Sequence, residues 1–296
     1  MSQGRWGIAL ESDEREGRGT TLSALGAFCV GALSSWAAAA LLKRHPPGGA
    51  ERWTRTNHAG RPVSLLEGPA YAVGAVTGAL AGGAGAPAAV AGLGAGAFGA
   101  LDDLVGDSSR KGLRGHLAAA RRGEVTTGAI KIAGLGATGL VSAWIVDRSR
   151  VRTGAMTTLA GGAVIAGSAN IANLLDLRPG RALKVVLLLA VPIVAGGRGT
   201  QLSTAAAGAA AGAAGAAMGV LADDLAGRSM LGDTGANSAG ALLGTALVAR
   251  TGLPGRLLAL AVVTVLTLAS EKVSFTAVIE STPGLRELDA LGRPPR

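Results

Sequence analysis

The stretch AYAVGAVTGALAGGAGAPAAVAGLGAGAFGAL, residues 70–101, decides the fold class, because it contains no charged residue. A helix needs about 20 mostly apolar residues to cross the hydrocarbon core of a membrane. This stretch is long enough for two crossings. Gly82, Gly83 and Pro87, which are residues that break regular structure, interrupt it near its middle. It therefore predicts two membrane-spanning helices joined by a turn.

The rest of the chain repeats this pattern of charge-free stretches between short charged clusters. Charged residues make up 16% of the sequence, against about 25% in an ordinary globular domain. We therefore predict an all-α protein, a polytopic transmembrane helical bundle of about nine spans, in which residues 1–296 form a single integral membrane domain. The predicted spans are residues 21–42, 68–81, 86–101, 128–146, 154–174, 183–197, 201–221, 236–250 and 256–274.

Small residues are unusually frequent, with 48 glycines in the chain. The lack of a Gly-X-Y period excludes collagen, and the many Leu and Val residues argue against a flexible linker. In lipid, small residues let helix backbones approach closely. Residues 205–218 are too weakly apolar to face lipid, so we expect that helix to lie inside the bundle. Small-residue helix faces are also compatible with a homodimer.

The distribution of Lys and Arg predicts an orientation. With nine spans, the loops on one side hold more than twice as many Lys and Arg as the loops on the other. The positive-inside rule makes the first side cytoplasmic. We predict a multi-pass cell-membrane protein with residues 1–20 outside and residues 275–296 in the cytoplasm. Orientation then accounts for the net charge of +9, since no basic patch with interleaved aromatic residues indicates nucleic-acid binding.

Three acidic clusters follow the third, fifth and seventh predicted spans, so they fall on the same predicted side. Adjacent carboxylates near a low-dielectric region repel one another unless a cation neutralises them. Mg²⁺ binds carboxylate oxygens and leaves positions for water and phosphate, so these acids beside Lys and Arg suggest a magnesium–phosphate site. Taken singly, each cluster also fits solvated loop residues or a helix cap. The clusters are Asp102, Asp103 and Asp107; Asp176; and Asp223, Asp224 and Asp233.

Other common chemistries lack their motifs. The three histidines show no zinc-site spacing. The chain has neither a G-x-x-x-x-G-K-[ST] phosphate loop nor a G-x-S-x-G nucleophile elbow. Cys29 is the single cysteine, which excludes a disulfide framework. The acidic clusters are therefore the strongest functional signal.

Two of these clusters lie in longer motifs, NIANLLD at residues 170–176 and LGDTG at residues 231–235. In order along the chain, the Asp pair and these two motifs resemble the polyprenyl-phosphate sugar-1-phosphate transferases, glycosyltransferase family 4. This membrane family includes phospho-N-acetylmuramoyl-pentapeptide transferase and UDP-N-acetylglucosamine-1-phosphate transferase. The likeness runs from about Asn57 to Gly244, and the chain resembles a short, divergent member.

The resemblance implies Mg²⁺-dependent transfer of a sugar-1-phosphate from a UDP-sugar to a polyprenyl phosphate, on the cytoplasmic face, for cell-envelope glycan synthesis. It also implies a role for each matching residue. These are Asp102, Asp103 and Asp176 for catalysis, Asp233 and Asp176 for the metal, and Asn170, Asn173 and Lys131 for the substrates.

The chain departs from the family pattern at several positions. Gly106 stands where the family has a Lys after its Asp pair, with Lys111 as the nearby substitute. Pro179 replaces the second Asp of the fifth-span motif, and the family's His-rich loop and final helix have no counterpart. We expect Arg178 and Arg181 to contact the diphosphate of the sugar nucleotide instead.

Two rival hypotheses stay open, and the first of them follows from these departures. One is an inactive relative that binds a lipid phosphate or serves as a scaffold. The other is a small-solute transporter with carboxylates along its pathway. The transporter is disfavoured because the acids gather on one side rather than at mid-membrane, and the retained aspartates argue against simple loss of activity.

Overall fold

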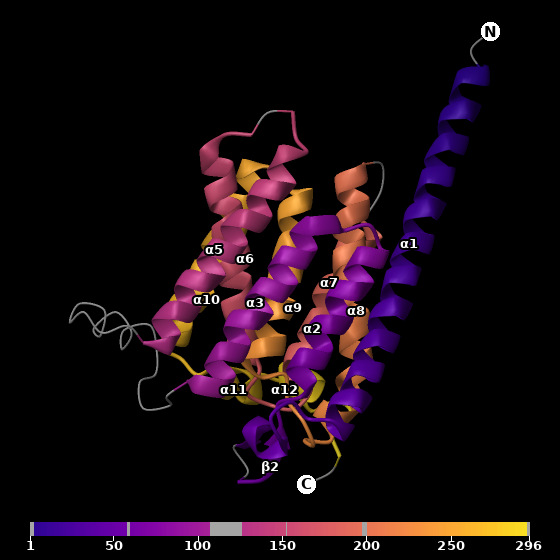
Figure 1. Ribbon diagram of the computed structural model, residues 1–296. Helices are drawn as coiled ribbons and strands as arrows, with labels where there is room; N and C mark the ends of the chain where they lie inside the picture. The colour runs from indigo at the N-terminus through magenta and orange to yellow at the C-terminus, as the bar shows by residue number, and fades with distance from the viewer. Residues whose placement is uncertain (1–2, 58–59, 107–125, 152, 197–199, 295–296) are drawn as a thin grey trace.

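The computed structural model describes residues 3–57, 60–106, 126–151, 153–196 and 200–294. Over these residues it is an all-α bundle with a small hairpin and two short helices at one end, which we call the acidic end (Figure 1). The long helices are α1 (Gln3–Arg44), α2 (Glu67–Ala81), α3 (Gly85–Val105), α5 (Thr127–Arg148), α6 (Ala155–Leu175), α7 (Arg181–Ala195), α8 (Gln201–Leu225), α9 (Gly232–Arg250) and α10 (Leu253–Ser270). At the acidic end lie η1 (Ala50–Trp53), the antiparallel strands β1 (Thr54–Thr56) and β2 (Pro62–Ser64), α11 (Phe275–Ser281) and α12 (Leu285–Ala290).

The predicted fold class is confirmed, since a helix occupies each predicted span, but the count of nine crossings is not established. Among the described residues, six helices are long and apolar enough to cross a membrane: α1, α3, α5, α6, α8 and α10. Helices α2 and α7 have 15 residues each, fewer than the about 20 that a crossing needs. Helix α9 begins with Gly-Asp-Thr-Gly and is buried along nearly its whole length, so other helices rather than lipid surround it.

Both ends of the chain carry more helix than the sequence predicted. Helix α1 begins at Gln3 rather than near residue 21, because the segment before residue 21 contains three Glu and three Arg residues, which are good helix formers. Residues 275–294, predicted to be a tail, contain α11 and α12.

The turn between α2 and α3 lies where the glycine pair predicted it. Gly83 has a φ of 78° and Gly85 a φ of 64°, a left-handed region that glycine enters without steric cost. The amide of Ala84 donates to the Ala79 carbonyl at 2.9 Å, and the amide of Gly83 donates to the Leu80 carbonyl at 3.0 Å. This pair of bonds is a Schellman motif, which ends α2 and reverses the chain.

Helix α8 lies in the interior, as its weak hydrophobicity predicted: residues 206–217 are all buried. Its glycines allow direct backbone contact with α1 and α2. A Cβ atom added to Gly212 would lie 2.3 Å from the Ala79 amide nitrogen, and one added to Gly31 would lie 2.5 Å from the Gly212 carbonyl oxygen. Close packing between small residues therefore holds these three helices together.

We expect Gly212→Ala to destabilise the protein, because the new methyl group meets backbone that cannot rotate away. Overpacking of this kind costs about 1–3 kcal/mol, and each kcal/mol lowers the thermal midpoint of a large domain by about 2–4 °C. The measurement is thermal unfolding in detergent. Gly136→Ala is the matched control, because nothing lies within 4 Å of its added Cβ. Equal midpoints for the two variants would show that the α2–α8 contact is looser than described.

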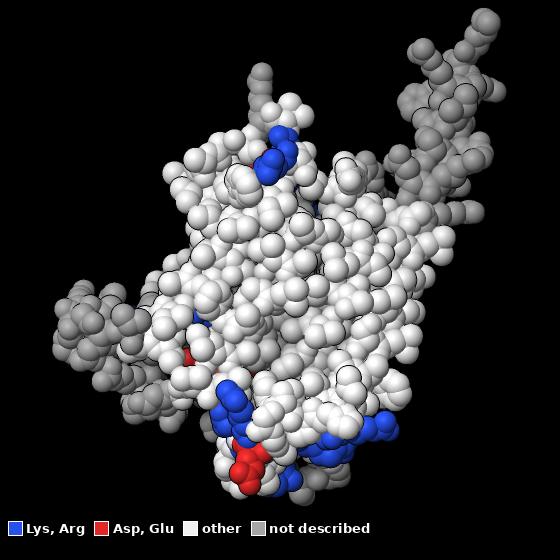
Figure 2. Space-filling view, viewed as in Figure 1, with Lys and Arg blue, Asp and Glu red and all other residues white. Residues whose placement is uncertain are grey.

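The surface has the pattern of a membrane protein. In Figure 2, charged side chains gather at the acidic end and in a smaller group at the opposite end, while the band between them is almost free of charge on this face. Helices α1 and α10 expose large apolar side chains, among them Leu33, Trp36, Leu258 and Val265. A soluble monomer rarely exposes so much apolar surface. The protein is therefore a membrane protein, and its orientation stays a prediction.

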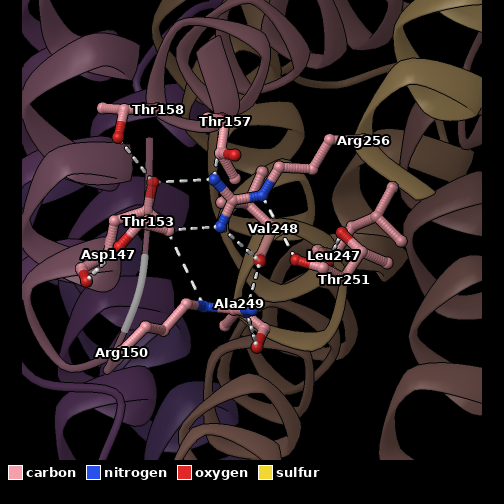
Figure 3. Close-up of polar contacts among 10 residues, drawn as sticks. All are labelled: Asp147, Arg150, Thr153, Thr157, Thr158, Leu247, Val248, Ala249, Thr251 and Arg256. Carbon is pink, nitrogen blue, oxygen red and sulfur yellow. Dashed lines mark hydrogen bonds and ion pairs between the residues drawn. The ribbon is translucent and has the colours of Figure 1, made fainter. Parts of the chain in front are cut away.

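A buried ion pair joins four helices at the opposite end (Figure 3). Asp147 of α5 and Arg256 of α10 are 4% and 0% exposed. The Arg256 Nη1 donates to Asp147 Oδ2 at 2.8 Å and its Nη2 to Oδ1 at 2.6 Å. Arg256 also donates to the carbonyls of Thr157 in α6 and Val248 in α9, at 2.8 and 3.0 Å. The Thr158 hydroxyl donates to Asp147 at 2.7 Å. The sequence analysis did not predict this pair.

Candidate functional site

The site is built around the N-terminus of α9. Asp103, near the end of α3, accepts hydrogen bonds from the Asp233 amide at 3.0 Å, the Thr234 amide at 2.8 Å and the Thr234 hydroxyl at 2.6 Å. Asp176, which follows α6, lies beside the Gly232 amide, which favours the ionised form of its carboxyl group. The first amides of a helix have no partner within the helix and carry partial positive charge. Carboxylates from two other helices therefore cap α9.

Three glycines let this arrangement form. Gly232 has a φ of 58°, and a Cβ there would lie 3.0 Å from both carboxylate oxygens of Asp103. A Cβ on Gly99 of α3 would lie 2.3 Å from the Asp233 carbonyl oxygen, and one on Gly68 of α2 would lie 2.3 Å from the Leu231 carbonyl oxygen. Helices α2 and α3 thus touch the LGDTG backbone directly, which brings the Asp pair to Asp233.

Lys131 of α5 joins two of the predicted carboxylates. Its Nζ lies 3.2 Å from Asp102 Oδ2 and also donates to Asp233 Oδ2. The three side chains are 13%, 24% and 20% exposed, in the order Lys131, Asp102 and Asp233. A lysine within an apolar helix needs an anionic partner, and here it has two. We call Asp102, Lys131 and Asp233 the lysine cluster.

The donor set of the lysine cluster fits Mg²⁺. In the part of the chain that the structure describes, no group of three or more His, Cys, Asp or Glu is placed to hold a metal ion. Mg²⁺ does not need such a cage, because it is usually held by one or two carboxylates, with water and substrate phosphates as the other ligands. Lys131 Nζ contacts a carboxylate oxygen of both Asp102 and Asp233, so the two carboxylates lie close enough together to bind one hard cation.

A second group of acids lies beside the first and is more deeply buried. Glu67 Oε1, Asp176 Oδ2 and Asp224 Oδ2 are each buried without a hydrogen-bond partner among the described residues. The other oxygens are satisfied, since the Ser229 hydroxyl donates to Glu67 and the Gly180 amide donates to Asp224 at 3.1 Å. Burial, and after it the charge of Asp224, raises the pKa of Asp176 well above its usual range. These oxygens therefore need a proton or a cation.

The sequence analysis missed Glu67, and it named Asp224 only as a member of an acidic cluster. The available signal was that Glu67 immediately precedes a predicted span whose first residues, Gly68 and Pro69, begin a helix readily. An acid at that position normally just complements the helix N-terminus. Its burial against α8 depends on helix packing, which sequence spacing does not report.

A cavity of about 700 Å³ opens next to Asp176 and Asp224. Its walls come from the α6–α7 connection, the end of α8, the hairpin and the C-terminal segment. Arg61, Arg178 and Arg293 line it together with the two carboxylates. This volume lies in the usual range of small-molecule sites.

The two predicted arginines have different positions. Arg178 lines the cavity and pairs with Glu280 at 2.9 Å. Arg181 is buried, and its Nε and Nη2 donate to the two carboxylate oxygens of Asp289 at 2.7 and 3.0 Å. Burial opposes ionisation of Asp289, but the Arg181 hydrogen bonds outweigh it and hold the pKa of Asp289 below its usual range. The structure thus brings Arg178 to the site and uses Arg181 to anchor α12.

The remaining predicted residues lie near the site or outside the described residues. Asn170 and Asn173 are partly buried in the last two turns of α6, and the Asn173 carbonyl accepts from the Asp176 amide at 3.1 Å. Their predicted contact with the nucleotide stays a prediction. Lys111 and Asp107 lie outside the described residues.

We expect Asp176→Asn to raise the thermal midpoint at pH 8 in the absence of divalent cations. A folded-state pKa above the unfolded value means that stability is lost as pH rises from the unfolded pKa, about 3.9, through the raised folded pKa. Asparagine carries no charge and has nearly the same shape as aspartate, so it avoids that loss. A gain of at least about 2 °C, equivalent to about 1 kcal/mol, should appear at pH 8 and shrink at pH 5.

The control for this pH series is Asp223→Asn, because Asp223 is paired with Lys43 and Arg228 near solvent. It should show no such pH-dependent gain. A lower midpoint for Asp176→Asn at pH 8 would mean that Asp176 is stabilised as the anion, contrary to the burial described.

Comparisons of this chain with protein-family models and with curated proteins found no match.

Proposed function

We propose that the protein is a Mg²⁺-dependent transferase that moves a sugar-1-phosphate from a UDP-sugar to a polyprenyl phosphate, for cell-envelope glycan synthesis. The observation that carries the proposal is the lysine cluster, in which Asp102, Lys131 and Asp233 from three helices meet at the acidic end of an apolar bundle. In the proposed orientation this end faces the cytoplasm, where sugar nucleotides are made.

The position of the cluster suits two very different substrates. Leu101, Val105 and Ile130 expose apolar side chains close in sequence to Asp102 and Lys131, so a polyprenyl chain has an apolar surface to follow. The cavity beside Asp176 offers arginines to a soluble nucleotide. A lipid phosphate and a sugar nucleotide can thus approach from the membrane and from water respectively.

The proposed reaction assigns separate roles to the two members of the Asp pair. A phosphate oxygen of the lipid bonds to the β-phosphorus of the donor, and the bond from that phosphorus to the bridging oxygen breaks, so UMP leaves. Mg²⁺ held by Asp102 and Asp233 would neutralise charge on the phosphates. Lys131 adds a second positive charge. Because three hydrogen bonds already occupy the Asp103 carboxylate, Asp102 is better placed to accept a proton or contact substrate.

The test is UMP release by the purified protein in detergent, with Mg²⁺, undecaprenyl phosphate and a panel of UDP-sugars. We expect release that requires lipid, metal and one of the donors, and a loss of at least about 100-fold in Asp233→Asn. Asp223→Asn is the matched control, since it makes the same change at a carboxylate paired with Lys43 and Arg228 outside the cluster. It should keep its activity.

Two other outcomes would contradict this proposal. Absence of UMP release from every donor, with folded protein that still binds Mg²⁺, would favour an inactive relative that holds a lipid phosphate. Equal release by wild type and Asp233→Asn would reject the assignment of the cluster as the active site.

A further inference from the structure

The C-terminal segment is anchored to the acidic end by contacts with the start of α7. The buried Arg181–Asp289 pair is the centre of these contacts. Beside it, the Arg181 Nη1 donates to the Thr276 hydroxyl at 2.8 Å, and Lys184 Nζ donates to the carbonyls of Leu288 and Asp289 at 3.1 and 2.6 Å. Buried charge-assisted bonds hold geometry more firmly than exposed ones. Helices α11 and α12 therefore form a fixed part of this end of the molecule.

This anchoring places Arg293 in the wall of the cavity. The Arg293 Nε donates to the Pro179 carbonyl at 2.7 Å, and its Nη2 lies 3.0 Å from Asp289 Oδ1. That Nη2 is buried and makes no hydrogen bond among the described residues. Pro294 lines the same cavity. Pro179 and Asp289 thus hold one guanidinium group in the cavity wall, and the Arg293 side chain is 20% exposed there.

The acidic and the basic side chains of the cavity differ in how deeply they are buried. Asp176 and Asp224 are 7% and 1% exposed, and backbone amides already contact both. Arg178 and Arg293 have side chains 27% and 20% exposed, and Arg61 is exposed. The carboxylates therefore lie deep and the guanidinium groups lie nearer the opening, where an entering anion meets them first.

We propose that Arg293, with Arg61 and Arg178, binds the diphosphate group of a nucleoside diphosphate in this cavity, so that the C-terminal segment completes the donor site. This rests on the proposed function and names the residues that recognise its donor. Guanidinium groups bind phosphate oxygens through paired donors. A diphosphate offers enough oxygens and negative charge for three arginines from three separate segments. Leu177, Leu225 and Met230 supply apolar surface in the same cavity for the nucleoside.

The experiment measures dissociation constants of UDP, inorganic pyrophosphate and uridine for the full-length protein in detergent, by calorimetry. We expect Arg293→Ala to weaken UDP and pyrophosphate binding by about 10- to 100-fold, the effect of losing hydrogen bonds to a charged group. Uridine affinity should not change. Arg293→Lys should recover part of the loss, because it restores the charge without the paired donors.

Arg286→Ala is the matched control, because Arg286 lies in α12 and pairs with Glu287 in solvent. It should leave all three affinities unchanged. Thermal midpoints of every variant would confirm that the C-terminal segment stays folded.

The outcomes separate this inference from the proposed function. If wild type binds UDP and Arg293→Ala binds it equally well, the inference is wrong and the transferase proposal stands. If Arg293-dependent binding occurs without UMP release from any donor, the inference stands and the transferase proposal fails. If wild type binds neither UDP nor pyrophosphate, or if Arg293→Ala weakens uridine equally, the inference is wrong.

Discussion

Arg256→Met should lower the free energy of unfolding by about 3–5 kcal/mol, because it removes the buried cation that is hydrogen-bonded to both oxygens of the Asp147 carboxylate. Asp147 is 4% exposed, and its two oxygens accept from Arg256 at 2.6 and 2.8 Å. The Thr158 hydroxyl would remain as a donor, and Arg150, whose Nε lies 3.7 Å from Asp147 Oδ1, would remain as a more distant cation. At about 2–4 °C per kcal/mol, the thermal midpoint in detergent should fall by roughly 10 °C.

The double variant Arg256→Met, Asp147→Leu tests the cause. Replacing both partners removes the uncompensated charge, so it should recover most of the lost stability, as exchange of a buried pair for apolar residues often does. Arg148→Met is the control at the same end of the bundle, since Arg148 is exposed and stacks on Trp144 at 4.7 Å. A double variant no more stable than Arg256→Met would show that packing, not the unpaired charge, causes the loss.

Lys131→Met should have the largest effect on the proposed reaction, a loss of about 10²–10³-fold in UMP release. This is the magnitude found when one group that stabilises charge in a transition state is removed. The lysine sits between two carboxylates that stay in place after the substitution. Release of UMP under saturating substrates is the measurement, with Lys43→Met, at the exposed Asp223 pair, as the control.

Mg²⁺ binding by the Lys131→Met variant distinguishes a role of Lys131 in the reaction from a purely structural role. With Lys131 gone, Asp102 and Asp233 lose the cation that competes for their oxygens, so stabilisation by Mg²⁺ in thermal unfolding should be at least as large as in wild type. Loss of both activity and Mg²⁺ stabilisation would instead mean that Lys131 mainly holds the cluster together.

Only part of the candidate site could be predicted from the sequence. The motifs placed Asp102, Asp103, Asp176 and Asp233 at one end of the helices, because each follows or begins a charge-free stretch and span ends are local features. The sequence could not predict that Asp103 caps α9 while Asp102 pairs with Lys131. The two residues are adjacent, and which one faces which neighbour depends on the rotation of α3 about its axis.

Residues without a motif were the hardest to anticipate. Glu67 and Arg293 lie far from the motifs in sequence and reach the site only because α2 packs on α9 and the C-terminal segment folds back. Arg181 was predicted to contact the diphosphate in place of the missing family elements, whereas its guanidinium group pairs with Asp289, more than a hundred residues later.

The sequence by itself determined the fold class, the ends of most helices, the α2–α3 turn and the interior position of α8. Each of these follows from length, hydrophobicity or glycine conformation within one segment. Only the tertiary structure decided the partners of buried charges, in the lysine cluster, at Glu67 and Asp224, and in the Arg256–Asp147 pair. The physical reason is that a buried charge must be satisfied by whatever the packed helices bring within about 3 Å. In this protein, close contacts at Gly99, Gly68 and Gly212 set that packing.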